Sequence, residues 1–168
     1  MEIIIPKKED YVRMAEIYNK AHKIFNGIYS EEEKIAFAEN FTETSESIRE
    51  SIQNRNVVCL KNDNQIFGYA IFRKKNNETV WLSSLYVDPD QQGNGYGTIL
   101  LKNVEQFTKE NNCVVVALET HRDAVWAINF YKKNGYEIVN EKITEFPFNK
   151  ILDKPPVPNR PILAKLIF

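Results

Sequence analysis

The sequence predicts an α/β (α+β) fold with a mixed, mostly antiparallel central sheet flanked by helices. Three short apolar runs, residues 57–60, 65–74 and 80–87, are separated only by turn-rich stretches, which is typical of an antiparallel meander. A helical pattern and then a continuous apolar run, residues 113–118, come next. A strand, a helix and a doubly buried strand in this order indicate a parallel crossover unit.

Length and composition predict one domain over residues 1–168. Single cores are commonly built from roughly 100 to 200 residues. Apolar residues make up 43% and charged residues 27% of the chain, a balance typical of globular proteins and not of disordered ones. We therefore expect a single packed core.

Charge, hydropathy and cysteine usage exclude several kinds of partner. The 22 basic and 23 acidic residues nearly cancel, which argues against nucleic acid or an anionic membrane surface as a partner. No apolar run approaches the ~20 residues of a membrane span, and the apolar segment in the first residues is shorter than we expect of a signal peptide. Cys59 and Cys113 lie in apolar stretches, which indicates buried thiols and no metal site. These features predict a cytoplasmic protein.

Helices are expected before the meander. Apolar residues recur at spacings of three and four over residues 9–22 and predict a first helix. Residues 44–47 supply N-cap side chains for a second helix that carries Ile48 and Ile52. The stretch between the two helices, residues 23–40, carries a mixed signal and is expected to be irregular.

The last third of the chain alternates again between helix and strand. A helix is expected over residues 124–133, and Gly135 suits the left-handed cap that ends it. Residues 136–139 and 162–168 then supply two closing strands. The proline-rich stretch between these strands, residues 141–161, is expected to be a loop near the mouth of the substrate site.

A glycine-rich turn, residues 92–97, connects the third strand of the meander to the following helix. Glycines at 93, 95 and 97 let backbone N–H groups converge, and the helix adds the positive end of its dipole. Such a turn suits a phosphate group. The plainer alternative is a connection that needs glycine only for its backbone angles.

Two other kinds of phosphate site have sequence requirements that the same residues can be compared with. A P-loop needs a lysine after its last glycine, whereas Gly97 is followed by Thr98 and Ile99, which excludes it. A dinucleotide-binding turn is a nearer alternative, because Glu119 lies where such folds place their ribose-binding acid. Its third glycine would fall at Thr98, however, and five residues, 88–92, separate the strand from the first glycine.

A family pattern appears in the turn. Gln92-Gly93-Asn94-Gly95-Tyr96-Gly97 follows the order Gln or Arg, two residues, Gly, one residue, then Gly or Ala. Together with residues 85–89 and 127–136, these residues resemble the GNAT superfamily of acyl-CoA N-acyltransferases. The resemblance implies a GNAT-like fold and an N-acetyltransferase that moves an acetyl group from acetyl-CoA to a primary amine.

The resemblance also implies roles for single residues. The pantetheine arm of acetyl-CoA would bind along Leu85, Tyr86 and Val87, chiefly through backbone groups of the first and third. The pyrophosphate would bind the amides of Gln92, Gly93, Asn94, Gly95, Tyr96, Gly97 and Thr98. Tyr131 would lie beside the thioester sulfur and act as general acid, since a phenol with a pKa near ~10 can protonate a thiolate. The alternative makes Tyr131 a packing residue.

The chain departs from the family pattern in two places. Ala124 stands where members often have an asparagine that contacts pantetheine, so Asp123 or another group must substitute. Residues 82–84 hold no carboxylate where many members have a general base. We take Glu119 as the tentative base, with a solvated strand end as the alternative, and give less weight to His121, which we expect to be exposed.

The acceptor amine is the least defined part of the prediction. Glu31, Glu32 and Glu33 could attract a cationic amine or simply favour a helix dipole. The layout is faintly similar to bacterial spermidine/spermine acetyltransferases, which makes a polyamine one candidate. The alternatives are a protein or peptide amino terminus and a non-catalytic acyl-CoA-binding regulatory module. A homodimer is compatible with the sequence.

Overall fold

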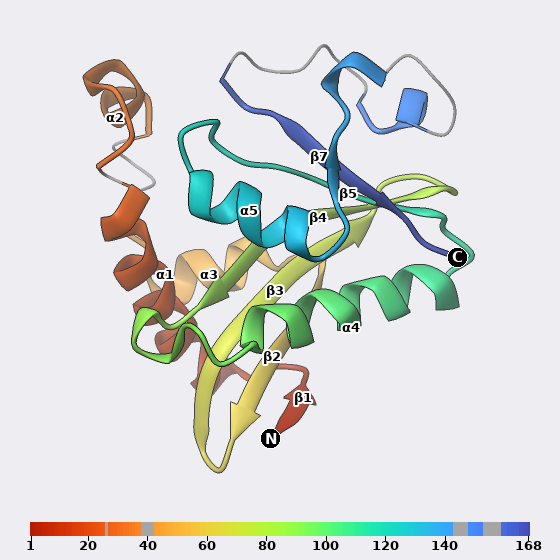
Figure 1. The fold of residues 1–168 in the computed structure, drawn as a ribbon. Helices are drawn as coiled ribbons and strands as arrows, with labels where there is room; N and C mark the ends of the chain where they lie inside the picture. Colours follow the sequence, from red (N-terminus) through yellow and green to blue (C-terminus); the bar gives the residue numbers. More distant parts are fainter. Residues whose placement is uncertain (26, 38–41, 143–147, 153–158) are drawn as a thin grey trace. The chain divides into compact units, whose positions relative to one another are not determined.

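The computed structural model describes residues 1–25, 27–37, 42–142, 148–152 and 159–168 (Figure 1). Among these residues the strands are β1 (Glu2–Ile4), β2 (Asn56–Asn62), β3 (Gln65–Lys74), β4 (Thr79–Val87), β5 (Val115–Glu119), β6 (Glu137–Ile138) and β7 (Ile162–Leu166). The helices are α1 (Tyr11–Phe25), α2 (Glu31–Phe37), α3 (Ser45–Ser51), α4 (Tyr96–Glu110) and α5 (Val125–Lys133). Short 3₁₀ turns are η1 (Lys8–Asp10), η3 (Pro89–Gln91), η4 (Asn140–Lys142) and η5 (Phe148–Lys150).

The described strands form a seven-stranded sheet in the order β1-β2-β3-β4-β5-β7-β6. β4 and β5 pair in parallel, with Thr79 opposite Val115, and α4 lies between them in the chain. β1 with β2, β5 with β7, and β6 with β7 pair antiparallel. The predicted mixed, mostly antiparallel sheet and its crossover unit are therefore confirmed.

By the density of their internal contacts, the described residues form two compact units. The first unit comprises residues of 1–71 and 84–101, and the second comprises residues of 72–83 and 102–168. β3, β4 and α4 each contribute to both units. The single-domain organisation stays a prediction.

The core of the first unit is built on the apolar face of α1. Met14 and Ile17 are fully buried there and pack with Ile48 of α3, Cys59 of β2 and Tyr69 of β3. The spacing of three between Met14 and Ile17 places both side chains on one face of the helix. The predicted first helix is confirmed, and Cys59 is the buried free thiol that its apolar neighbours indicate.

Two N-terminal caps fix where α2 and α3 begin. Thr44 accepts a hydrogen bond from the Ser47 N–H at 3.2 Å, which confirms the predicted cap of the second helix. Ser30 and Glu33 form a capping box at the start of α2. The Glu33 N–H donates to the Ser30 hydroxyl at 3.2 Å, and the Ser30 N–H donates to the Glu33 carboxylate at 2.9 Å. The expectation that residues 23–40 are irregular is therefore wrong for α2.

The core of the second unit centres on β5 and β7. Val115, Ala117 and Ile162 are fully buried in it, and so is Ile151, with Phe148 only 7% exposed. The last two residues belong to the stretch expected to be a loop near the substrate site. Phe148 and Ile151 thus pack in the core, closeness of this stretch to the substrate site stays a prediction, and residues 143–147 and 153–158 lie outside the described part of the chain.

The remaining boundaries follow the prediction closely. Gly135 has φ +88°, so the left-handed cap after α5 is confirmed. β5 begins at Val115, two residues later than expected, because the chain first turns at Asn112, whose φ is +54°. β1 was not expected. None of the described helices has both the length and the apolar character needed to cross a bilayer.

Candidate active site

β4 leads through η3 into the glycine-rich turn, residues 92–97. Gly93 and Gly95 have φ values of +84° and +79°, in the left-handed region that residues with a Cβ rarely adopt. A Cβ built on either glycine meets no atom within 4 Å, so the space beside both is open. Gly97 lies within the first turn of α4. Backbone angles therefore require two of the three glycines, and room for a ligand remains.

The N–H groups of this turn are available to a ligand. The Ile99 N–H donates to the Gly95 carbonyl at 3.2 Å, and this bond opens the ladder of α4. In the part of the chain that the structure describes, no acceptor pairs with the N–H groups of residues 93–98. The Gln92 N–H instead donates to the Pro89 carbonyl at 3.4 Å. Unpaired donors at the positive end of a 15-residue helix make an anion site.

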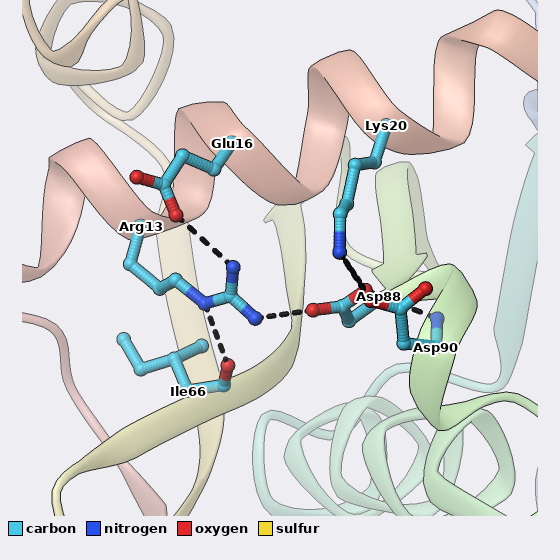
Figure 2. Close-up of polar contacts among 6 residues, drawn as sticks. All are labelled: Arg13, Glu16, Lys20, Ile66, Asp88 and Asp90. Atoms are coloured by element: carbon cyan, nitrogen blue, oxygen red, sulfur yellow. Dashed lines mark hydrogen bonds and ion pairs between the residues drawn. The ribbon is translucent and has the colours of Figure 1, made fainter.

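Asp88 anchors the loop that carries the turn (Figure 2). Its side chain is 3% exposed, and one oxygen accepts the Asp90 N–H at 3.1 Å and the Lys20 ammonium at 3.2 Å. The other oxygen accepts from the guanidinium of Arg13, which also donates to the Ile66 carbonyl at 3.3 Å. Burial opposes ionisation, but these hydrogen bonds and charges outweigh it and hold the pKa of Asp88 below its usual value.

The Tyr86 side chain packs away from the strand into a group of rings. Its centroid lies 5.1 Å from that of Tyr18 and 5.6 Å from that of Tyr69, and its hydroxyl lies 3.2 Å from His22 Nε2. Leu85 and Val87 alternate with Tyr86 along β4, so their side chains take the opposite face of the strand.

Tyr131 is a buried residue of α5 in the second unit. It is 8% exposed, and its ring lies 5.1 Å from that of Phe130 and 5.7 Å from that of Tyr136. Burial raises the pKa of the Tyr131 hydroxyl well above its usual value, because the phenolate would lose its solvation. The hydroxyl therefore keeps its proton at neutral pH, and the same shift makes it a weaker acid than an exposed phenol.

The two candidate bases lie in different surroundings. Glu119 ends β5, and its carboxylate, 36% exposed, accepts a hydrogen bond from Arg160 at 3.4 Å. His121 is 5% exposed, so the expectation of an exposed histidine is wrong. Its Nδ1 accepts the Asp123 N–H at 3.2 Å, which leaves that lone pair occupied.

The acidic run at the start of α2 serves the helix itself. Glu31 forms an ion pair with Lys34 at 2.5 Å, and Glu33 caps the helix by accepting the Ser30 N–H. Both contacts fit the interpretation in which these acids favour the helix dipole. Among the described residues, no group of three or more His, Cys, Asp or Glu side chains is arranged to hold a metal ion.

A comparison with protein families identifies the chain as a whole. A model described as the acetyltransferase (GNAT) family matches residues 14–136, well over half of the 168 residues. The chain belongs to the GNAT acetyltransferase family. The resemblance seen in residues 85–97 and 127–136 is thereby confirmed at the level of the family.

Single relatives match this GNAT protein either over part of its length or at low sequence identity. YxbD of Bacillus subtilis (strain 168), an uncharacterized protein, is 35% identical over 81 residues, which cover 47% of this chain and 48% of YxbD. The matched part thus spans about half the length of this curated relative. The PaiA N-acetyltransferase from Thermoplasma acidophilum, crystallised in complex with coenzyme A, has a TM-score of 0.76, 21% identity and 98% coverage of both chains.

A second solved structure extends the comparison. The ribosomal-protein-S18-alanine N-acetyltransferase from Escherichia coli has a TM-score of 0.68 and 17% identity, with 99% of this chain and 93% of that chain covered. At these identities the likeness shows the fold alone. It supports the GNAT fold that the element order predicts.

The start of α5 is where this GNAT protein departs from the expected pattern. Ala124 is the fully buried N-cap residue of the helix, and its N–H donates to the His121 carbonyl at 3.0 Å. Its methyl group offers no hydrogen bond to a ligand. The carboxylate of Asp123, 56% exposed, lies within 3.8 Å of His121 and 3.7 Å of Arg122. Asp123 as a substitute for asparagine stays a prediction.

Sequence reasoning missed two residues that shape the turn. Asp88 was treated only as part of the connection, although an Asp-Pro pair after a strand is typical of a side chain that bonds its own turn. Gly68 allows β3 to approach β4, because a Cβ there would lie 2.6 Å from the Tyr86 carbonyl oxygen. A glycine inside a strand pattern is a signal of such close approach.

Proposed function

We propose that this GNAT protein is an N-acetyltransferase that moves the acetyl group of acetyl-CoA to a primary amine of a small molecule. One observation carries the proposal, the row of unpaired N–H groups of residues 93–98 at the N-terminus of α4. A pyrophosphate is the part of coenzyme A that such donors would bind. Backbone groups of Leu85 and Val87 would hold the pantetheine arm.

The donor supplies a thioester when it is bound, and the chain supplies the proton transfers. The amine nitrogen forms a bond to the thioester carbonyl carbon, and the carbon–sulfur bond then breaks. We assign Tyr131 as the general acid that donates its hydroxyl proton to the departing thiolate, because this hydroxyl carries its proton at neutral pH. Packing against Phe130 and Tyr136 fixes the ring that carries this proton.

The amine itself must first lose a proton. A lysine-like ammonium with a pKa of ~10.4 costs roughly 4 kcal/mol to deprotonate at neutral pH. Glu119 is our candidate acceptor, directly or through water. Its hydrogen bond with Arg160 competes for one carboxylate oxygen, so proton transfer through water to the other oxygen is the route we favour.

A protein or peptide amino terminus is the second candidate acceptor. The Escherichia coli neighbour is by its name an alanine N-acetyltransferase of ribosomal protein S18, and it shares the fold of this chain. A polyamine is the form of the small-molecule proposal that the sequence resemblance suggests. The third alternative, an acyl-CoA-binding regulatory module without catalysis, is favoured by Ala124 and by the β4 stretch without a carboxylate.

The test is release of free thiol from acetyl-CoA in the presence of an amine and peptide panel. We expect turnover with at least one small amine, and a fall in kcat of about 10²-fold or more in Tyr131→Phe with unchanged acetyl-CoA affinity. Tyr136→Phe is the matched control, because it keeps the ring that packs against Tyr131 and removes only a hydroxyl for which we propose no role. Tight acetyl-CoA binding without turnover on any amine or peptide would favour the binding module.

A further inference from the structure

Within the described part of the chain, aromatic rings gather at the strand segment proposed for the pantetheine arm. The name aromatic cluster is used here for four of these residues, Tyr18, His22, Tyr69 and Tyr86. Tyr18 and His22 are one helical turn apart on α1 and stack at 4.0 Å with an interplanar angle of 21°. Tyr86 meets both rings, at 5.1 and 5.9 Å.

The aromatic cluster reaches from the core to the surface of the first unit. Tyr69 is 1% exposed and belongs to the core beneath, whereas Tyr18, His22 and Tyr86 are half-buried. Burial lowers the pKa of His22 to about 4, so its imidazole is neutral at neutral pH. The half-buried rings are therefore uncharged π faces.

A carboxylate is fixed next to these rings. The Glu43 backbone N–H donates to Asn19 Oδ1, and Asn19 Nδ2 donates to the Glu43 carbonyl, both at 2.8 Å. Its carboxylate accepts a hydrogen bond from the Ser47 hydroxyl. Burial raises the pKa of the Tyr18 hydroxyl, and the negative charge of Glu43 raises it further.

The neighbouring lysine of α1 leaves this negative field in place. Lys20 lies between Tyr18 and His22 in the sequence, but its ammonium binds Asp88 at 3.2 Å and Asp90 at 2.5 Å. Figure 2 shows Lys20 extending from α1 towards these two carboxylates. The Lys20 ammonium is therefore paired with Asp88 and Asp90, and we do not expect it to neutralise the charge of Glu43.

We propose that the aromatic cluster and Glu43 bind the acceptor amine as an aliphatic ammonium ion. Neutral aromatic faces attract a cation through their quadrupoles, and a nearby carboxylate adds charge compensation. Tyr86 connects this site to the reaction, because it lies between Leu85 and Val87, the residues proposed to hold the pantetheine arm. The inference rests on the proposed function and specifies its acceptor, an amine that is charged in water, in preference to an uncharged arylamine.

Binding measured without turnover tests the site directly. Calorimetric titration of the full chain, saturated with coenzyme A, would use spermidine and butylamine as cationic probes and p-anisidine as a neutral amine. We expect the cationic probes to bind and the neutral amine to bind at least about tenfold more weakly. Equal binding of the neutral amine, or no binding of either cationic probe, would overturn the inference.

Three variants separate recognition from folding. Glu43→Gln keeps the hydrogen-bonding shape and removes the charge, and Tyr18→Leu removes a ring face; each should weaken spermidine binding about tenfold. Tyr18→Phe keeps the ring face and should restore binding to within about threefold of the unmodified chain. The matched control is Glu46→Gln, a carboxylate of α3 that pairs with Arg49, and it should leave binding unchanged.

The same variants keep this inference distinct from the proposed function. Spermidine affinity that is the same in Glu43→Gln, Tyr18→Leu and the unmodified chain would overturn the ammonium site while leaving acetyl transfer intact. Charge-selective binding without thiol release on any amine would instead contradict the transferase and leave the ammonium site standing.

Discussion

Arg13 of α1 forms an ion pair with the buried carboxylate of Asp88, a residue 75 positions later in the chain. Asp88 is the N-cap of η3, which leads into the turn whose N–H groups form the anion site, and its own N–H donates to the Phe67 carbonyl at 2.8 Å. One residue, through its carboxylate and its backbone N–H, thus joins the first helix, β3 and the loop that carries the glycine-rich turn. The shape of the turn therefore depends on residues far from it in the sequence.

Replacing Asp88 by asparagine should weaken coenzyme A binding. The amide cannot compensate Arg13 and Lys20, and its NH₂ group faces one of these cations, so the loop loses its anchor. We expect about tenfold lower affinity and a free energy of unfolding reduced by about 1–3 kcal/mol, less than for a fully buried pair because both cations are partly exposed. Calorimetry with coenzyme A and urea denaturation measure the two effects.

Asp90→Asn is the control for this substitution. Asp90 also pairs with Lys20, but its side chain is 72% exposed. Such a surface pair contributes less than about 1 kcal/mol, so we expect affinity and stability close to those of the unmodified chain. Coenzyme A affinity that is unchanged in Asp88→Asn would show that the turn keeps its shape without this anchor.

The left-handed glycines allow a second prediction with an internal control. Gly95→Ala and Gly135→Ala both place a Cβ at positive φ, +79° and +88°, and each should cost about 1–2 kcal/mol of stability. Only Gly95 lies in the turn. Coenzyme A affinity should therefore fall in Gly95→Ala and stay unchanged in Gly135→Ala when both are titrated below their melting temperatures. Equal losses of affinity would mean that the effect is one of stability alone.

These two positions also show which parts of the molecule the sequence predicts. Glycine turns, apolar alternation and helix caps are local, so the meander, the crossover unit and the turn at residues 92–97 could be predicted. α2 was not predicted although Ser30 and Glu33 carry its capping signal, because residues 23–40 have a mixed helical pattern. β1 is only three residues long and is defined by its pairing with β2, which no local pattern reveals.

In the candidate site, too, features that local sequence determines were predictable, and features that depend on contacts between distant residues were not. The N–H donors of the turn were predictable because glycine spacing and a helix start determine them. The anchor at Asp88 was not, since its partners Arg13 and Lys20 come from α1. The burial of His121 depends on tertiary packing, and an isolated histidine in a sequence gives no measure of it. The aromatic cluster likewise requires α1, β3 and β4 to meet.

The low pKa of His22 predicts a pH-dependent stability. Burial lowers it to about 4, below the unfolded value of ~6.5, so the unfolded chain binds the proton more readily between these two values. The stabilisation from a neutral His22 is complete above about pH 6.5 and is lost as the pH falls towards 4. With solvent screening of a half-buried ring, we expect a loss on the order of 1–2 kcal/mol.

His22→Phe isolates this effect from that of the carboxylates. Phenylalanine keeps the stacking position beside Tyr18 but cannot be protonated, so its stability should change less with pH over this interval. Urea denaturation of both proteins at several pH values from 4 to 7 measures the difference. Parallel curves for the two proteins would show that His22 is equally easy to protonate in the folded and unfolded chains.

Gly68→Ala should show how closely the turn depends on the packing of β3 against β4. The new Cβ would lie 2.6 Å from the Tyr86 carbonyl oxygen and 3.2 Å from Val87 Cα, so backbone atoms must move. We expect about 1–3 kcal/mol of lost stability. The backbone shift should reach Asp88, because the Asp88 N–H donates to the carbonyl of Phe67, the residue before Gly68. We therefore expect the affinity for coenzyme A to fall as well.

Gly27→Ala is the matched control for the added methyl group. Its Cβ would meet only the Ile24 carbonyl oxygen, at an ordinary contact distance of 3.6 Å, and we expect a change in stability within about 0.5 kcal/mol. Thermal unfolding and calorimetry with coenzyme A compare the two variants. A Gly68→Ala variant that loses stability but binds coenzyme A as before would show that the distortion of β4 does not reach Asp88. In that case the ion pairs of Asp88 with Arg13 and Lys20 would keep the turn in its shape.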